Sequence, residues 1–230
     1  MKQFKFLIII FLTPYAYTSS AQVESIQLGD QTLQVELLFE EDFNDLSDWT
    51  IESTCTPYIE NEMLVWPCEG EEGMGTIWCN QRFDGPTLVT YEVVSLEGMQ
   101  NINFFAYASH PEGLLQTTGE RTGHYSEYHN FQNYIVTFLT NGEAQWRVRF
   151  RKDPGFGLLS EKYVEMDTAT GQPHQMAYLF DEAGDFTLFV DQQKILTAKD
   201  TSGVYRTGYH GLRTWRSKLK YNNFKVYNLH

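Results

Sequence analysis

Short segments rich in β-branched and aromatic residues recur along the chain, each bounded by Gly, Pro, Asn or Asp. Helical periodicity is almost absent. Strands that follow one another without intervening helices favour packed antiparallel sheets over a parallel sheet. Residues 140–142 and 181–184 are expected to form hairpin turns, with glycine where a positive φ is needed. The expected strands span residues 33–39, 75–79, 87–94, 102–107, 134–139, 146–150, 175–180, 185–190 and 221–227. We therefore predict an all-β fold, a two-sheet antiparallel β-sandwich of the jelly-roll kind.

The first 21 residues have the character of an export signal. Lys2 and Lys5 precede the apolar residues 6–12, and small residues at 19–21 provide a cleavage site. The apolar stretch is too short to span a bilayer. We expect residues 1–21 to be removed, residues 22–230 to form one domain, and the protein to be periplasmic or secreted.

The charge is uneven along the chain. The formal net charge is −13, and residues 22–81 contain 14 acidic residues but no Lys or Arg. We expect no nucleic acid partner, because neutralising the phosphates of a duplex needs a basic face. The acidic third is interpreted as a solvated face. Asp42, Asn44, Asp45 and Asp48 offer oxygens to a hard cation but lack the spacing of a known calcium loop, so no metal or other cofactor is predicted.

Three cysteines occur in a chain expected to meet an oxidising compartment. An odd number indicates one disulfide and one remaining thiol. We favour a Cys55–Cys68 disulfide. Cys79 follows Trp78 in an apolar run and is interpreted as a small buried hydrophobe.

Residues 119–129 carry more ionisable and hydrogen-bonding groups than a connecting loop needs. A polar loop that satisfies its own backbone remains the alternative. The candidate functional residues in this segment are Arg121, His124, Tyr125, Glu127, Tyr128 and His129.

Residues 121–129 read Arg-Thr-Gly-His-Tyr-Ser-Glu-Tyr-His, and this pattern resembles the YesU-like family of bacterial jelly-roll proteins, whose relatives accompany pectin and uronate degradation. The similarity extends over residues 75–228 through short motifs. These are Trp78-Cys79, Arg151-Lys152 with Gly155-Phe156, Gly211-Leu212-Arg213, and Phe224. The resemblance implies a concanavalin-like sandwich. Part of it also points toward enzymes of ulvan oligosaccharide breakdown, although His110, His124 and His210 are additions to the family pattern.

Two further segments are basic. In residues 205–216, strand alternation would place Tyr209 and Arg213 on one face and His210 on the other, unless a bulge intervenes. In residues 146–152, alternation would place Arg147, Arg149 and Arg151 on one side of a strand. That side is a candidate surface for carboxylate or sulfate groups, and pairing of these arginines with the many acidic residues is the alternative. Lys162 and Tyr163 are candidates for closing over a bound sugar, and a solvated loop is the alternative.

These residues suit β-elimination across C4 and C5 of a uronic acid. An arginine fork matches the carboxylate, and His or Tyr side chains can move the two protons. Our leading hypothesis is a carbon-oxygen lyase or dehydratase acting on an acidic, ulvan-type oligosaccharide. The proposed proton-transfer residues are His124, Tyr125, His210 and His110. This hypothesis requires the segments around positions 124 and 210 to converge, with arginine side chains, on one hollow of the sheet. The proposed substrate-binding residues are Arg121, Tyr128, His129, Arg147, Arg151, Lys162, Tyr205 and Arg213.

The rival hypothesis is a non-catalytic carbohydrate-binding jelly-roll module, because fold does not determine function. Other chemistries have less support in the sequence. It shows no paired carboxylates at a glycosidase spacing, no zinc motif, no phosphate-binding loop and no serine-nucleophile elbow.

Overall fold

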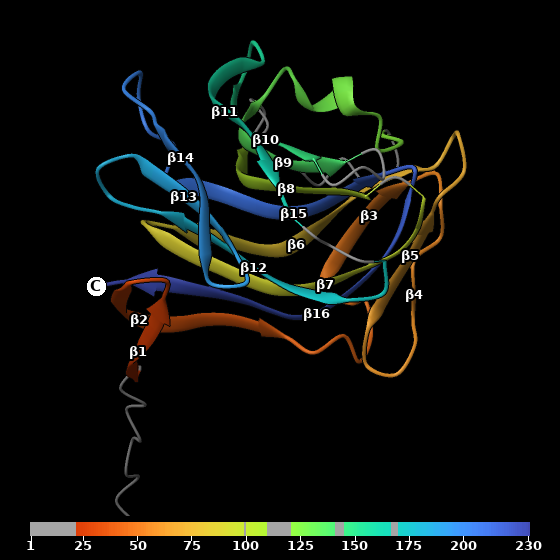
Figure 1. The fold of residues 1–230 in the computed structure, drawn as a ribbon, viewed down its shortest axis with the longest axis horizontal. Coiled ribbons are helices and arrows are strands. Elements are labelled where there is room, and N and C mark those ends of the chain that lie inside the picture. The colour runs from red at the N-terminus through yellow and green to blue at the C-terminus, as the bar shows by residue number, and fades with distance from the viewer. Residues whose placement is uncertain (1–21, 99, 110–120, 141–144, 167–169) are drawn as a thin grey trace, which may run out of the picture.

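The computed structural model describes residues 22–98, 100–109, 121–140, 145–166 and 170–230. Within these residues the chain forms two antiparallel sheets packed face to face (Figure 1). The helical structure described is one short 3-10 turn, η1 (Tyr125–Tyr128). The predicted fold class, a two-sheet antiparallel β-sandwich, is confirmed.

The first sheet has nine strands in the described part of the chain. Its main path runs in the order β1 (Val23–Leu28), β2 (Gln31–Glu41), β16 (Ser217–Leu229), β7 (Thr87–Gly98), β12 (Pro173–Phe180), β13 (Asp185–Val190), β14 (Gln193–Lys199). A side branch adds β5 (Leu64–Cys68), which pairs with β16, and β4 (Tyr58–Ile59), which pairs with β5.

The second sheet has seven strands among the described residues. Its order is β11 (Gly157–Glu165), β10 (Gln145–Asp153), β9 (Gln132–Thr140), β8 (Gln100–Ser109), β15 (Thr207–Trp215), β6 (Met74–Asp84), β3 (Trp49–Ser53). One face packs on the first sheet. We call the opposite face of this seven-stranded sheet the outer face.

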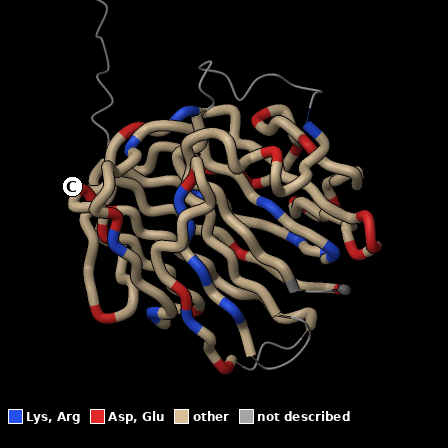
Figure 2. The backbone as a smooth tube through the Cα atoms, turned by 90° about the horizontal axis from the view of Figure 1, so that it is seen from above, with Lys and Arg blue, Asp and Glu red and all other residues tan. Residues whose placement is uncertain are grey.

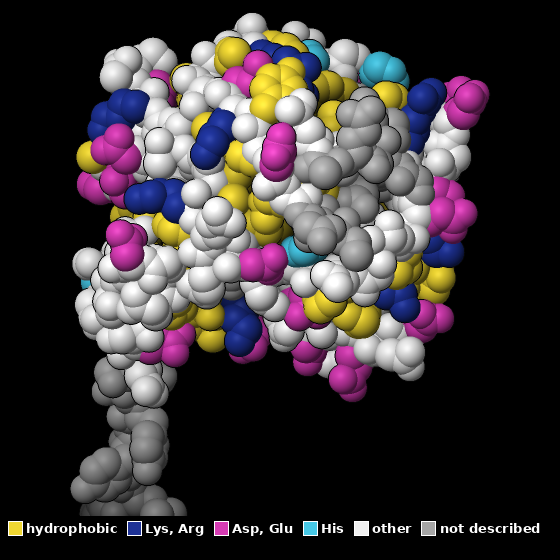
Figure 3. Space-filling model, viewed as in Figure 1, with side chains coloured by type: hydrophobic (Ala, Val, Ile, Leu, Met, Phe, Trp, Pro, Cys, Tyr) yellow, Lys and Arg dark blue, Asp and Glu magenta, His cyan; other side chains and the backbone are white. Residues whose placement is uncertain are grey.

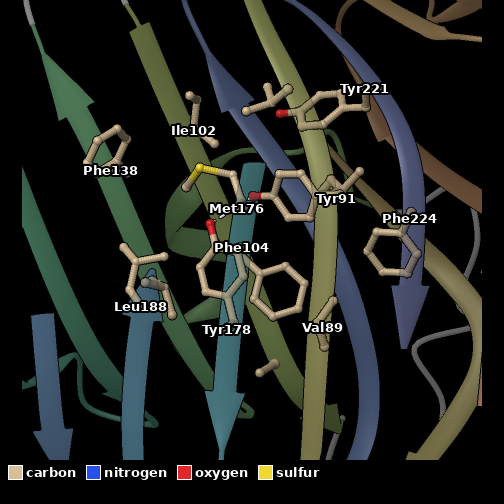
Figure 4. Close-up of a cluster of buried hydrophobic side chains, with 14 of the residues drawn as sticks. Val89, Tyr91, Ile102, Phe104, Phe138, Met176, Tyr178, Leu188, Tyr221 and Phe224 are labelled. Carbon is tan, nitrogen blue, oxygen red and sulfur yellow. Dashed lines mark hydrogen bonds between the residues drawn. The ribbon is translucent and has the colours of Figure 1, made fainter. Parts of the chain in front are cut away.

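The core lies between the sheets and is built largely from aromatic rings (Figure 4). Tyr91 of β7 and Tyr178 of β12 stack, and their hydroxyl groups lie 2.8 Å apart in a hydrogen bond. Phe104 of β8 reaches Tyr178 from the other sheet, with ring centroids 4.5 Å apart. Stacked and tilted rings add to the free energy of burial, so this contact helps hold the two sheets together.

Every segment expected to be a strand lies within an observed strand. The turn at residues 181–184 forms the β12–β13 hairpin, with Gly184 at φ +79° and its N–H donating to the carbonyl oxygen of Asp181. The other expected turn reaches into residues 141–144, outside the described residues. The strands not expected from the pattern include β1, β3, β11, β14 and β15.

Charge is distributed differently on the strands and at the margins. Lys and Arg positions occupy the middle of the view in Figure 2, whereas Asp and Glu positions are frequent around its edge. The face in Figure 3 shows acidic and basic side chains interspersed. Two acids of the N-terminal third, Glu41 and Glu52, are buried rather than solvated.

Cys55 and Cys68 form a disulfide with a Cα–Cα distance of 5.6 Å, and Cys79 is a buried thiol. Burial raises the pKa of Cys79 to about 12. Within the described ranges, no helix has the length and apolar character needed to cross a bilayer.

Candidate functional site

The outer face of the seven-stranded sheet is organised in rows that run across the strands. Because the strands pair in register, side chains from neighbouring strands line up at right angles to the chain. One row is polar from edge to edge: Glu161, Arg149, Thr137, Asn103, Arg213, Thr76 and Glu52. The next row on one side is apolar in its centre, with Ile135, Phe105 and Trp78.

The segment 121–131 covers the apolar row. Tyr128 and Phe131 are buried against Trp78, Phe105 and Ile135 in one cluster. The ring centroids of Tyr128 and Phe105 lie 5.1 Å apart. In Figure 1 the short turn η1 lies over the sheet on the side away from β7 and β16. This segment therefore covers the apolar row and the Glu52 end of the polar row.

A buried carboxylate anchors the segment. Glu52 on β3 accepts hydrogen bonds from Nε of Arg121 at 2.9 Å, from the hydroxyl of Tyr128 at 2.9 Å and from Nε1 of Trp78 at 3.0 Å. The Arg121 and Glu52 side chains are only 10% and 1% exposed. Burial lowers the Arg121 pKa, but the ion pair and hydrogen bond to Glu52 outweigh it and leave that pKa raised.

Glu127 shapes the turn itself. Its carboxylate accepts backbone N–H groups of Thr122, Gly123 and His124 at 3.0 to 3.1 Å. Gly123 has φ +87°, and a Cβ there would collide with the backbone carbonyl of Glu52. Glycine is therefore required for the close approach of segment 121–131 to β3.

A hollow of about 330 Å³ lies beside the segment, over the open part of the outer face. Its floor comes from β6, β8, β9, β10 and β15, and its wall from η1 and the residue before it. The lining residues are Met74, Asn101, Asn103, His124, Tyr125, Thr137, Leu139, Arg149, Arg213 and Trp215.

Arg213 is the central charge of this hollow. It is 3% exposed, and it forms no ion pair or side-chain hydrogen bond with any residue of the described ranges. Its guanidinium lies 4.4 Å from the centroid of the Tyr125 ring. Burial lowers the Arg213 pKa to about 10, still well above neutrality. A buried cation without a carboxylate partner is costly, so the site favours an anionic ligand.

Arg149 adds a second positive charge. Its Nε donates to Oγ1 of Thr137 at 3.1 Å, and burial together with the neighbouring Arg147 lowers its pKa. The amide oxygens of Asn101 and Asn103 are buried and have no partner in the described part of the chain. The hollow thus combines two guanidinium groups with unsatisfied amides, a set that suits a carboxylate surrounded by hydroxyl groups.

His124 and Tyr125 provide groups able to move protons. Nδ1 of His124, which is exposed, lies 3.0 Å from Oγ of Ser126. The Tyr125 hydroxyl is buried and has no partner among the described residues. Burial raises the Tyr125 pKa to about 12, although the positive charges of Arg213 and Arg149 oppose that rise. Tyr125 therefore stays protonated at neutral pH.

His129 contacts Tyr125, and Arg151 contacts Phe156, which also packs against Tyr125. The His129 ring is 4.2 Å from that of Phe156 and 4.8 Å from that of Tyr125. Arg151 stacks on Phe156 at 4.0 Å and donates to its carbonyl oxygen. Burial and the charge of Arg213 lower the His129 pKa. Both residues support the position of Tyr125 and do not line the hollow.

His210 does not join the hollow. A bulge falls between Tyr209 and Gly211, but His210 still points between the sheets, with its ring 4.9 Å from Phe83 and 5.1 Å from Tyr107. It is fully buried, and burial lowers its pKa to about 3 against an opposing effect of the Phe105 backbone. His210 is thus a neutral core residue on the opposite face of the sheet from His124. His110 lies outside the described residues.

The remaining candidate binding residues are held by other contacts. Tyr128 and Arg121 anchor segment 121–131 through Glu52. Arg147 pairs with Glu161, and Lys162 donates to the carbonyl oxygen of Ile195 at 3.3 Å. Tyr205 packs on Tyr134, with ring centroids 5.2 Å apart, beside the buried Lys152–Asp200 ion pair. Neither Lys162 nor Tyr205 lines the hollow.

Several site residues were not singled out from the sequence. Asn101 and Asn103 lie in an otherwise apolar strand, and that polarity within a predicted strand is a usable signal. Arg149 was placed with Arg147 and Arg151 but not chosen as a binding residue. Glu52 had no local signal because its partner Arg121 is 69 residues away.

A metal site finds no support in the described ranges. No group of three or more His, Cys, Asp or Glu side chains there could hold a metal ion. Asp45 instead accepts the backbone N–H of Ser47.

The fold and the hollow define a jelly-roll β-sandwich with a cationic site on one sheet. The chain belongs to the family described as Domain of unknown function (DUF6250), whose model matches residues 69–224. No curated protein sequence matches it significantly.

Three solved structures are similar in fold. A protein of unknown function with a galectin-like fold from Bacillus subtilis has a TM-score of 0.72 and 21% identity, over 84% of this chain and 96% of that one. The carbohydrate-binding module CBM66 from Bacillus subtilis has a TM-score of 0.55 and 14% identity, over 78% and 94%. An endo-β-1,3-glucanase from Pyrococcus furiosus has a TM-score of 0.62 and 13% identity, over 90% and 98%. At these identities the similarity establishes the fold.

Proposed function

We propose that the hollow binds a uronic acid unit of an acidic oligosaccharide and catalyses β-elimination across its C4 and C5. The observation that carries this proposal is the buried guanidinium of Arg213, which faces the hollow without an acidic partner among the described residues. Two of the structurally similar proteins are named for carbohydrate binding or cleavage, which agrees with a saccharide ligand.

In this proposal Arg213 and Arg149 hold the carboxylate. Their charge stabilises the negative charge that develops when the C5 proton is removed. The fork geometry of arginine matches a carboxylate, and the low exposure of Arg213 strengthens the interaction. Asn101 and Asn103 offer amide groups to the sugar hydroxyls.

His124 is the base and Tyr125 the acid. The His124 imidazole takes the C5 proton, the C5–H electron pair becomes the C4–C5 double bond, and the C4–O bond breaks. Tyr125 protonates the leaving oxygen, a role that suits a phenol kept protonated by a pKa near 12. The products are an unsaturated uronate and either water or a shorter saccharide. An exported protein would meet such substrates outside the cytoplasm.

The test is the ultraviolet absorbance of the unsaturated product during incubation with uronate oligosaccharides. We expect product from the unchanged protein and from His210→Phe, and a loss of at least about 100-fold in His124→Ala. Equal rates in the unchanged protein and His124→Ala would contradict the assignment.

A non-catalytic carbohydrate-binding module is the second candidate. It is favoured by the location of His210 in the core, which leaves fewer proton-transfer groups at the hollow than the sequence suggested. This candidate predicts saccharide affinity that depends on Arg213 and no absorbance change.

A further inference from the structure

We infer that β10 and β11 carry a second sugar subsite beside the hollow, and that this subsite takes an uncharged sugar unit. The ligand would then be an oligosaccharide that joins an acidic sugar to a neutral one. This inference rests on the proposed function, because it takes the hollow as the place of the acidic unit.

The subsite is continuous with the hollow. Arg149, which lines the hollow, lies directly opposite Glu161 on β11, and Arg147 lies opposite Tyr163. Arg147 also lies opposite Leu139, another lining residue. Tyr163 is therefore a diagonal neighbour of Arg149, at a Cα separation of roughly 7–8 Å. A saccharide leaving the hollow in this direction crosses Arg147 and reaches Tyr163.

Tyr163 has the properties of a stacking platform. It is 54% exposed, although it lies on a strand of a packed sheet. The Arg147 guanidinium lies 5.8 Å from its ring centroid, on the outer face. A pyranose has an apolar ring face and a polar rim, so an exposed ring beside a hydrogen-bonding pair complements it.

The charge of the subsite differs from that of the hollow. Arg147 is neutralised by Glu161, with Nε and Nη2 at 2.8 and 2.7 Å from its Oε2. An acidic sugar here would have to displace Glu161 and would be repelled by it. The hydroxyl groups of a neutral sugar can donate to Glu161 and accept from Arg147. Arg213, in contrast, has no such acid among the described residues.

The charge argument is tested by calorimetric titration with digalacturonate and with galacturonate–rhamnose disaccharides in both linkage orders. We expect the unchanged protein to bind one of the mixed disaccharides more tightly than digalacturonate. Glu161→Gln frees Arg147, so the preference should shift about tenfold toward digalacturonate. Asp185→Asn breaks an exposed Lys199 pair on the other sheet and should leave the preference unchanged. Tighter binding of digalacturonate by the unchanged protein, or no shift in Glu161→Gln, overturns the inference.

The platform is tested by comparing Tyr163→Ala with Tyr58→Ala, since Tyr58 is similarly exposed but lies on β4 of the other sheet. Tyr163→Ala should weaken the mixed disaccharide about three- to tenfold and leave galacturonate itself unchanged. Tyr58→Ala should change neither. Equal affinities in Tyr163→Ala and the unchanged protein refute the subsite while leaving the hollow intact. Failure of the unchanged protein to bind galacturonate or either disaccharide refutes the proposed function and, with it, the subsite.

Discussion

The Arg213 guanidinium lies 4.4 Å from the centroid of the Tyr125 ring, and this contact joins the floor of the hollow to its wall. Arg213 comes from β15 and Tyr125 from η1, which are separated by strands β9 to β14 along the chain. The ring face attracts the cation but cannot replace a carboxylate. The protein thus keeps a buried positive charge beside a buried phenol with no protein acid to balance it in the described ranges.

Arg213→Met should weaken ligand binding without lowering the free energy of unfolding. The Arg213 pKa is lowered to about 10, so the folded state holds this proton less tightly than the unfolded state does, and the charge costs stability at neutral pH. We expect the free energy of unfolding to stay unchanged or to rise by about 1 kcal/mol, while uronate affinity falls more than tenfold. Urea denaturation and calorimetric titration measure the two effects.

Lys152→Met is the matched control. Lys152 is also a mostly buried cation, but it pairs with Asp200 at 2.7 Å. Its removal leaves Asp200 buried without that cation and should cost about 3–5 kcal/mol. If Arg213→Met is as destabilising as Lys152→Met, Arg213 has a structural role instead.

Tyr125→Phe should lower turnover more than binding. The change removes the hydroxyl that would protonate the leaving oxygen and retains the ring that contacts Arg213. General acid catalysis contributes about 10²–10⁴-fold, so kcat should fall within that range while KM changes little. Steady-state kinetics by ultraviolet absorbance measure both. Because the Tyr125 pKa is near 12, the unchanged protein should show no alkaline loss from this group up to about pH 10. A kcat of Tyr125→Phe equal to that of the unchanged protein would show that Tyr125 is not the acid.

Glu52→Leu should release segment 121–131 from the sheet. It deletes the acceptor of Arg121, Tyr128 and Trp78 in a buried position. Breaking a buried ion pair from one side costs about 3–5 kcal/mol. Urea denaturation should show this loss, and hydrogen exchange should show faster exchange of the backbone N–H groups at residues 122–129. Asp185→Asn, in an exposed pair, should cost less than about 1 kcal/mol. Equal losses in the two variants would mean that Glu52 does not anchor the segment.

The sequence allowed the sandwich and most of its strands to be predicted, because alternation and turn residues are local signals. It also separated Arg213 from His210 by alternation along β15, and the structure places them on opposite faces. The edge strand β11 was not predicted. Much of it is exposed, and its sequence therefore lacks the alternation of a half-buried strand.

The composition of the hollow was less predictable. The expected convergence of His124 with His210 is not found. Side chains alternate between the two faces of β15, and this alternation places the His210 ring between the sheets, among phenylalanine and tyrosine rings. The hollow instead depends on cross-strand register between β8, β10 and β15, which brings Asn103, Arg149 and Arg213 into one row. Register between distant segments has no local signature in a single sequence.

The His210→Phe variant should retain activity. Its free energy of unfolding should decrease less on acidification than that of the unchanged protein. The folded-state pKa of His210 is about 3, below the ordinary value of 6.5, so the unfolded state binds this proton more tightly. The contribution of the neutral His210 ring to the free energy of unfolding is therefore fully present above pH 6.5 and is lost as the pH falls toward 3. Between pH 7 and pH 5 this loss is about 2 kcal/mol. Asp153, whose pKa burial raises to about 6, acts in the opposite direction. Urea denaturation of the variant and the unchanged protein at both pH values isolates His210, since Asp153 cancels in the difference. A parallel pH dependence in the two proteins would show that His210 is already solvated or charged.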